Sequence, residues 1–220
     1  MFIVLLLSTA LVFSHAQIPM GRTPVLDGVM LAAEWSDAAR WEFIGGDGVY
    51  VKRDSVFLYL GLRAQKGGFA SISISKGDTI RILHSSTATL TALYERGVSG
   101  DWHLAHAFES VDGAWDPGSP RPRPDAEAEE LKQQHLSTYS WLASTVSFGN
   151  PNEMEFQISL GLIEPGQSFI SVVFYQHNGD VQFAHAPPGL SDGSLNQGLV
   201  RGGSPETLDF RPESWALLAW

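Results

Sequence analysis

The sequence predicts an all-β protein, an antiparallel β-sandwich with a short surface helix and a proline-rich loop insertion. Three observations lead to this fold class. Several segments alternate apolar and polar residues with the period of a strand, and glycine-rich turn signals separate them. A single stretch, after a cluster of prolines, carries the signals of a helix start. The chain of 220 residues is long enough for one domain with a buried core.

The clearest strand signals are two segments, 70–75 and 154–160, in which apolar residues alternate with polar ones. Because successive side chains of a strand point to opposite faces, each segment should place one face on the core and the other in water. Segment 102–108 alternates too, and this places four side chains on one face: Trp102, Leu104, His106 and Phe108.

Two further segments, 56–62 and 169–175, are apolar on both sides. Such runs are typical of central strands or of strands covered by a second layer. Additional strands are predicted at 49–53, 80–84, 87–94 and 215–220.

Turn signals rich in Gly, Asn and Asp separate these segments, at 45–48, 66–68, 76–78 and 178–180. Their spacing favours antiparallel neighbours in an all-β sandwich. Lys76-Gly77-Asp78 lies between two strand candidates and predicts a hairpin.

One region breaks the strand pattern. The prolines at 117, 120, 122 and 124 predict an irregular, extended loop. From Asp125, which can cap a helix, to about Leu136 we expect a surface helix, with acidic residues near its positive N-terminal end. A long loop is expected at 189–205 because this segment is rich in Gly and Ser.

Residues 1–16 have the pattern of a signal peptide. An apolar run from Phe2 to Phe13 precedes Ser14-His15-Ala16, a small-x-small cleavage site. The run is shorter than the roughly 20 residues that span a bilayer, so no membrane span is expected after its removal. We therefore predict a single domain over 17–220 in an extracytoplasmic location, periplasmic or secreted. No Lys or Arg precedes Arg22, and the alternative is a buried N-terminal strand.

Charge and composition exclude several classes of function. The net charge of −10 disfavours nucleic acid as a partner, because an acidic surface repels phosphate backbones. The absence of cysteine excludes disulfides, thiol nucleophiles and cysteine zinc sites. The sequence also lacks the serine-hydrolase elbow, the metalloprotease helix motif and the nucleotide-binding glycine loops. These features favour binding over catalysis. They do not exclude a glycosidase, because its two catalytic carboxylates can lie far apart in the sequence.

The N-terminal part of the predicted domain contains the most specific motif. It reads Pro24-Val25-Leu26-Asp27-Gly28, then Glu34-Trp35, and later Asp54 followed by the run Val56–Leu62. Over residues 23–64 the chain resembles family-9 carbohydrate-binding modules, which belong to the DOMON-like sandwich group. Segment 154–160 resembles a late strand of that fold. Asp27-Gly28 also suits a tight turn, and we interpret Asp27, Gly28, Trp35 and Tyr59 as structural.

The resemblance implies an exported, non-catalytic domain that binds carbohydrate or a similar polar ligand between aromatic rings. Trp115 lies in the polar, turn-rich segment 112–117, so it is the candidate platform, with Asp112 beside it. The alternative is that Trp115 anchors this loop by packing onto the sandwich. Trp102, His84 and His106 are further candidates, although we interpret Trp102 as a core residue and the two histidines as buried side chains bonded to backbone or hydroxyl groups. The alternative function is a structural or protein-interaction domain in which every tryptophan is buried.

Two cofactors follow from relatives of this fold. Some DOMON domains hold haem through Met and His, and Met154 with His84 is the pair that the sequence offers, without support from its spacing. Related modules carry structural calcium, for which Asp112, Asp116 or Asp47 can supply oxygen ligands. Apart from these two cases, we expect no cofactor.

Overall fold

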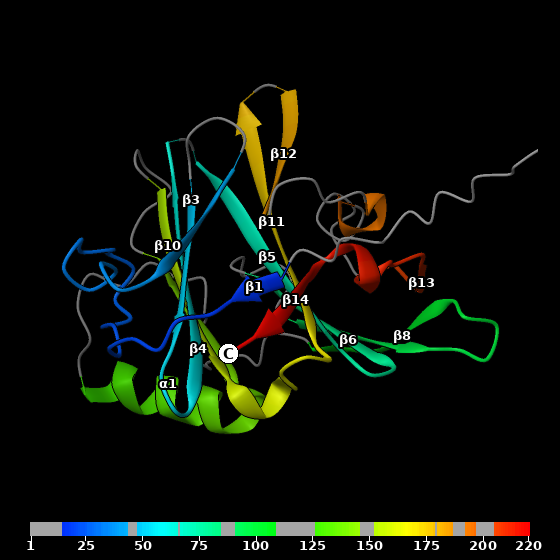
Figure 1. Cartoon of the computed structure of the whole chain (residues 1–220), viewed down its shortest axis with the longest axis horizontal. Coiled ribbons are helices and arrows are strands. Elements are labelled where there is room, and N and C mark those ends of the chain that lie inside the picture. The colour runs from blue at the N-terminus through cyan, green and yellow to red at the C-terminus, as the bar shows by residue number, and fades with distance from the viewer. Residues whose placement is uncertain are drawn as a thin grey trace, which may run out of the picture.

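The fold is an all-β sandwich of two packed sheets, as the alternating segments predict (Figure 1). It is seen in a computed structural model that describes residues 15–43, 48–65, 67–84, 91–108, 126–145, 152–178, 180–186, 192–196 and 205–220. Figure 1 shows helix α1 (Ala126–Tyr139) at one end of the molecule and the hairpin of β11 (Phe169–Asn178) and β12 (Asp180–Ala186) at the other.

The larger sheet, sheet A, follows the order β1 (His15–Gln17), β14 (Ala216–Ala219), β11 (Phe169–Asn178), β5 (Gly68–Lys76), β6 (Thr79–His84), β7 (Thr91–Arg96), β8 (Trp102–Phe108) and β13 (Thr207–Leu208), and β12 (Asp180–Ala186) also pairs with β11. The smaller sheet, sheet B, follows the order β2 (Ala39–Glu42), β3 (Gly48–Arg53), β4 (Phe57–Ala64), β10 (Asn152–Ser159) and β9 (Trp141–Thr145). Among the described strands, β1 and β14 form the one parallel pair of named strands.

The main core lies between the two sheets. Leu60 and Phe156 from sheet B face Ile72 and Phe174 from sheet A, and all four side chains are fully buried. Adjacent strands contribute every second residue to this layer, because the period of a strand is two.

The hydroxyl face of β5 is not in water, so that part of the prediction is wrong. Ser71, Ser73 and Ser75 are only 2%, 1% and 3% exposed. A second apolar cluster covers this outer face of sheet A, and it includes Phe210 and Trp215 from the C-terminal segment. Alternation alone cannot distinguish a solvated face from one that a distant segment covers.

Most predicted elements are confirmed within one to four residues. The hairpin at Lys76-Gly77-Asp78 joins β5 to β6, and Gly77 has the positive φ of 56° that such a turn needs. The helix extends three residues beyond Leu136, and Ser140 follows it with a φ of 64°. Asp125, the proline-rich loop and most of segment 189–205 lie outside the described residues.

Strands β2, β9, β12 and β13 carry weaker signals and were not predicted. Short 3-10 helices also connect the strands: η1 (Leu160–Leu162), η2 (Gly193–Asn196) and η3 (Pro212–Ser214).

The N-terminal end of the described chain is part of sheet A. His15 and Ala16, the last two residues of the predicted leader, pair with Leu217 and Leu218 of β14. Ala16 is 6% exposed, and Ile18, which follows the expected cleavage point, is buried in the main core. Among the residues that the structure describes, no helix has the length and apolar character needed to cross a membrane.

Candidate functional site

The motif residues near the N-terminus hold the loop over residues 21–38 onto the outer face of sheet B. The side chain of Asp27 accepts a hydrogen bond from the backbone N–H of Val29 at 2.9 Å, which forms a local turn. Gly28 follows with a φ of 85°, a conformation that side chains disfavour. Both observations support the structural interpretation of Asp27-Gly28.

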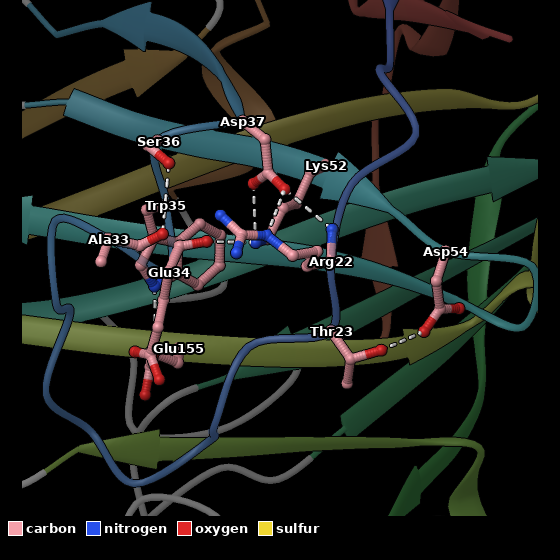
Figure 2. A network of polar contacts seen from close by, with 10 residues as sticks. All are labelled: Arg22, Thr23, Ala33, Glu34, Trp35, Ser36, Asp37, Lys52, Asp54 and Glu155. Carbon is pink, nitrogen blue, oxygen red and sulfur yellow. Dashed lines mark hydrogen bonds and ion pairs between the residues drawn. The ribbon is translucent and has the colours of Figure 1, made fainter.

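Glu155 on β10 fixes this turn from below. One carboxylate oxygen accepts the backbone N–H groups of Asp27 and Gly28 at 3.1 and 2.8 Å. The other accepts the indole N–H of Trp35 at 3.1 Å, a contact drawn in Figure 2. Glu155 is 0% exposed, and burial raises its pKa to about 8. The hydrogen bonds from Gly28 and Trp35 lower the pKa by less than burial raises it.

Lys52 on β3 is a buried charged residue in the same network (Figure 2). Its ammonium group donates to the carbonyl of Glu34 and, at 2.9 Å, to a carboxylate oxygen of Asp37. It also lies 5.1 Å from the ring centroid of Trp35. Because its three donors meet oxygens and a ring face, this lysine can be fully buried while charged.

Asp54 lies at the turn between β3 and β4 and is a further hydrogen-bond acceptor in this region. It accepts the hydroxyl of Tyr59 at 2.6 Å and the backbone N–H groups of Val56 and Phe57 at 2.7 and 2.8 Å. Burial and the bond to Asp54 raise the pKa of Tyr59 above its usual range. The motif residues therefore form hydrogen bonds to Glu155 or to each other, and these bonds hold the loop against sheet B. Asp27 and Trp35 bond to Glu155, and Tyr59 bonds to Asp54.

An aromatic row on the outer face of sheet A offers a better surface for a ligand. Phe69 on β5 and Phe183 on β12 both lie directly opposite Tyr175 on β11. The rings of Phe69 and Tyr175 stack with centroids 6.2 Å apart, and those of Tyr175 and Phe183 are 5.6 Å apart. All three residues are half-buried. We call Phe69, Tyr175 and Phe183 the aromatic row.

A row of histidines and a serine lies next to the aromatic row on the same face. Across four neighbouring strands, this row runs from His84 on β6 to His185 on β12. Ser71 on β5 and Val173 on β11 lie between them, each directly opposite its neighbours. Nδ1 of His84 and the hydroxyl of Ser71 share a hydrogen bond of 2.5 Å. Burial lowers the pKa of His84 to about 4 and also lowers that of His185, so both are neutral at pH 7.

The structure separates the other residues that the sequence proposed for ligand binding. Trp102 is 3% exposed and its indole N–H donates to the carbonyl of Phe210, so it packs in the second apolar cluster. His106 does not lie on the same face of β8 as Trp102, so that part of the prediction is wrong. A bulge in β8 places both Leu104 and His106 opposite the consecutive residues Tyr94 and Leu93 and reverses the alternation.

The consequence is that His84 and His106 cannot line one pocket. His84 lies on the outer face of sheet A, whereas exposed His106 lies opposite Leu93 and Arg81, on the side that faces sheet B. Met154, the suggested haem partner of His84, is buried in the core between the sheets. These residues therefore do not converge.

Trp115, Asp112, Asp116 and Asp47 lie outside the described residues, so the expected platform and calcium ligands stay predictions. Within the described ranges, no group of three or more His, Asp or Glu side chains is arranged to hold a metal ion.

The aromatic row was not predicted from the sequence, although one local signal pointed to it. A turn at Asn178-Gly179-Asp180 was expected, and the pairing of Asn178 with Asp180 brings Tyr175 opposite Phe183. The contribution of Phe69 depends on β5 pairing with β11, which are about a hundred residues apart, and no local pattern encodes that contact.

Comparison with known proteins gave matches among solved structures alone. No family model matches the chain, and no curated protein does. A family-9 carbohydrate-binding module from Caldicellulosiruptor kristjanssonii in complex with cellotriose has 9% identity and a TM-score of 0.45, over 93% of this chain and 94% of that one. A structure of a family-9 module from the same organism in complex with glucose has 10% identity and a TM-score of 0.42, over 80% of this chain and 88% of that one. Both belong to the family that residues 23–64 resemble.

Proposed function

We propose that this protein is a non-catalytic carbohydrate-binding domain and that the aromatic row is its sugar platform. The observation that carries the proposal is the alignment of three half-buried rings from neighbouring strands on one sheet face. Aromatic faces suit the apolar C–H faces of sugars, and a platform on paired strands is rigid before the ligand arrives.

The surroundings of the row support a neutral ligand. His84 and His185 are uncharged at pH 7 because burial lowers the pKa of each. Sugar hydroxyls need donors and acceptors at the rim of such a platform, and the imidazole of half-buried His185 can supply both, whereas His84 is 3% exposed and bonds to Ser71.

The decisive experiment is a titration of the full chain with a panel of soluble oligosaccharides that includes cellotriose and glucose. We expect saturable binding that becomes at least about tenfold weaker in Tyr175→Ala, because the central ring of the row is lost. Tyr50→Ala is the matched control, since Tyr50 is also half-buried but lies on sheet B. Binding that survives in Tyr175→Ala and disappears in Trp115→Ala would move the platform to the segment predicted from sequence.

The alternative, a structural or protein-interaction domain, predicted that every tryptophan is buried. Among the described tryptophans, Trp35, Trp102, Trp141 and Trp215 are buried, while Trp41 and Trp220 are half-buried. The chain also exposes Met20, Val25, Val29 and Leu31 at 60%, 58%, 39% and 56%. If no saccharide in the panel binds, this apolar loop favours the interaction alternative.

Export is the second part of the proposal. The apolar run and the Ser14-His15-Ala16 site support removal of residues 1–16 in an extracytoplasmic protein. N-terminal sequencing of protein secreted by a heterologous host should then begin at Gln17. An N-terminus that still contains His15 and Ala16 would instead support the alternative of a retained strand β1.

A further inference from the structure

A polar cleft lies at the end of the sandwich near the C-terminal end of α1. It consists of two adjoining cavities of about 120 and 130 Å³ that share Arg81 and Leu162. Strands β5, β6 and β7 of sheet A form one wall, and the end of α1, the start of β9 and η1 form the other. The lining includes Tyr139 and Trp141 and the hydroxyls of Thr138 and Ser140.

Arg81 occupies an unusual position in this cleft. It lies opposite Ile74, a core residue, and two positions from the core residue Leu83 on the same strand. Its side chain therefore points to the side of sheet A that faces sheet B. An arginine on such a side is normally paired, because removing its charge from water is costly. Within the described part of the chain, the half-buried guanidinium of Arg81 makes no hydrogen bond or ion pair.

Trp141 supplies a second unsatisfied donor in the same cleft. The side chain is 1% exposed, and its indole N–H is buried without a hydrogen-bond partner among the described residues. Buried polar groups are almost always hydrogen-bonded, so this N–H marks a place where an acceptor is missing.

The charge of the cleft is positive although the chain carries −10. Lys76 adds a second cation, and its ammonium group donates to the carbonyl of Gly161 at 3.2 Å. No Asp or Glu is among the described residues that line the two cavities. The end of α1 contributes about half an elementary negative charge, which is less than the two full positive charges.

We propose that this cleft binds a sugar that carries an acidic group, a carboxylate or a sulfate. The planar fork of Arg81 pairs with the acidic group through two parallel hydrogen bonds. The hydroxyls of Thr138 and Ser140 contact the hydroxyls of the sugar, against a wall that includes Trp141. The cleft shares no residue with the aromatic row, so either proposal can fail alone.

Isothermal titration of the full chain at low ionic strength tests this site. The ligands are glucuronic acid, its neutral counterpart glucose, and inorganic sulfate, because sulfate carries the charge without the sugar. The variants are Arg81→Gln and the control Arg211→Gln, which removes an exposed arginine that pairs with Asp209. Arg81→Lys keeps the charge and removes the fork. Circular dichroism of each variant confirms that it folds.

We expect glucuronic acid to bind the native chain and to bind at least about tenfold more weakly to Arg81→Gln, because the charge-assisted pair is lost. Arg81→Lys should lie between the two, and Arg211→Gln should match the native chain. Sulfate that binds as tightly as glucuronic acid would assign the cleft to free oxyanions and overturn the role of the sugar ring. The proposal is overturned altogether if neither anion binds, or if Arg81→Gln changes the affinity for glucuronic acid less than twofold. Glucose binding that is lost in Tyr175→Ala but not in Arg81→Gln belongs to the aromatic row.

Discussion

Replacing Glu155 by glutamine tests whether a buried, protonated carboxyl holds the N-terminal loop. The substitution keeps the shape of the side chain and removes its ionisation. Native Glu155 accepts two backbone N–H groups on one oxygen and the indole N–H of Trp35 on the other. A protonated carboxyl can still accept through both oxygens, whereas the nitrogen of an amide cannot accept.

The hydrogen-bond loss is the part of the effect that does not depend on pH. The amide oxygen can keep the contacts to Asp27 and Gly28, and the amide nitrogen then meets the indole N–H of Trp35. One buried donor is left without an acceptor. Glu155→Gln should therefore lower the free energy of unfolding at pH 7 by about 1–3 kcal/mol.

The pH-dependent part follows from the raised pKa. In the folded chain the pKa of Glu155 is about 8, and its ordinary value is 4.5, so folding favours the protonated form. The contribution of this group to stability is complete below pH 4.5 and is lost as the pH rises through 8. Between pH 7 and pH 9 the native chain should lose about 1.4 kcal/mol from this carboxyl. Glu155→Gln lacks this loss, so its deficit relative to the native chain should shrink by the same amount.

Urea unfolding followed by tryptophan fluorescence at pH 5, 7 and 9 measures both parts. The matched control is Glu153→Gln on the same strand, whose carboxylate pairs with Arg63 at 2.7 Å in a half-buried position. It should show the same loss of stability from pH 7 to pH 9 as the native chain. The reasoning is refuted if the native chain and Glu155→Gln lose equal stability over that range.

Two further substitutions test the loop network and the sheet. Lys52→Met keeps the buried stem but leaves the Glu34 carbonyl and Asp37 without their donor, and urea unfolding should show a loss of about 2–3 kcal/mol. A loss below about 0.5 kcal/mol would show that the ion pair adds nothing beyond the packing of the stem. Gly68→Ala would place a Cβ 2.1 Å from the backbone oxygen of Tyr175, so β5 and β11 must separate and thermal unfolding should occur at a lower temperature, for a loss of about 2 kcal/mol or more. Gly193→Ala meets no atom within 4 Å, and a similar loss there would contradict the steric explanation.

The structural role of the motif residues could be predicted from the sequence, whereas their hydrogen-bond partners could not. Asp27-Gly28 forms a turn for reasons local to two residues. Its fastening depends on Glu155, which is 127 positions from Gly28 in the chain. From the sequence, Glu155 is one polar residue of an alternating strand and should face water. The loop that covers it comes from the far end of the domain, so the local pattern cannot predict its burial.

The prediction for His106 failed for a different reason. Its strand was predicted with the correct bounds, 102–108, but the bulge opposite Leu93 and Tyr94 reversed the side of the sheet that His106 faces. One extra residue in a ladder changes every subsequent side chain from one face to the other. No residue in the segment marks the bulge, so the prediction continued the alternation of faces through it.

The sequence by itself determined the fold class, the strands with strong alternation, the β5–β6 hairpin and the presence of one helix, because these follow from periods and turns that neighbouring residues encode. The tertiary structure alone decided which surfaces are open. It covered the serines of β5 with the C-terminal segment and aligned Phe69, Tyr175 and Phe183 from three strands. It also placed Arg81 at the end of the core without an ion-pair partner among the described residues. Each of these outcomes depends on contacts between segments distant in the chain, and a hydrophobic pattern specifies that a face is buried without specifying what buries it.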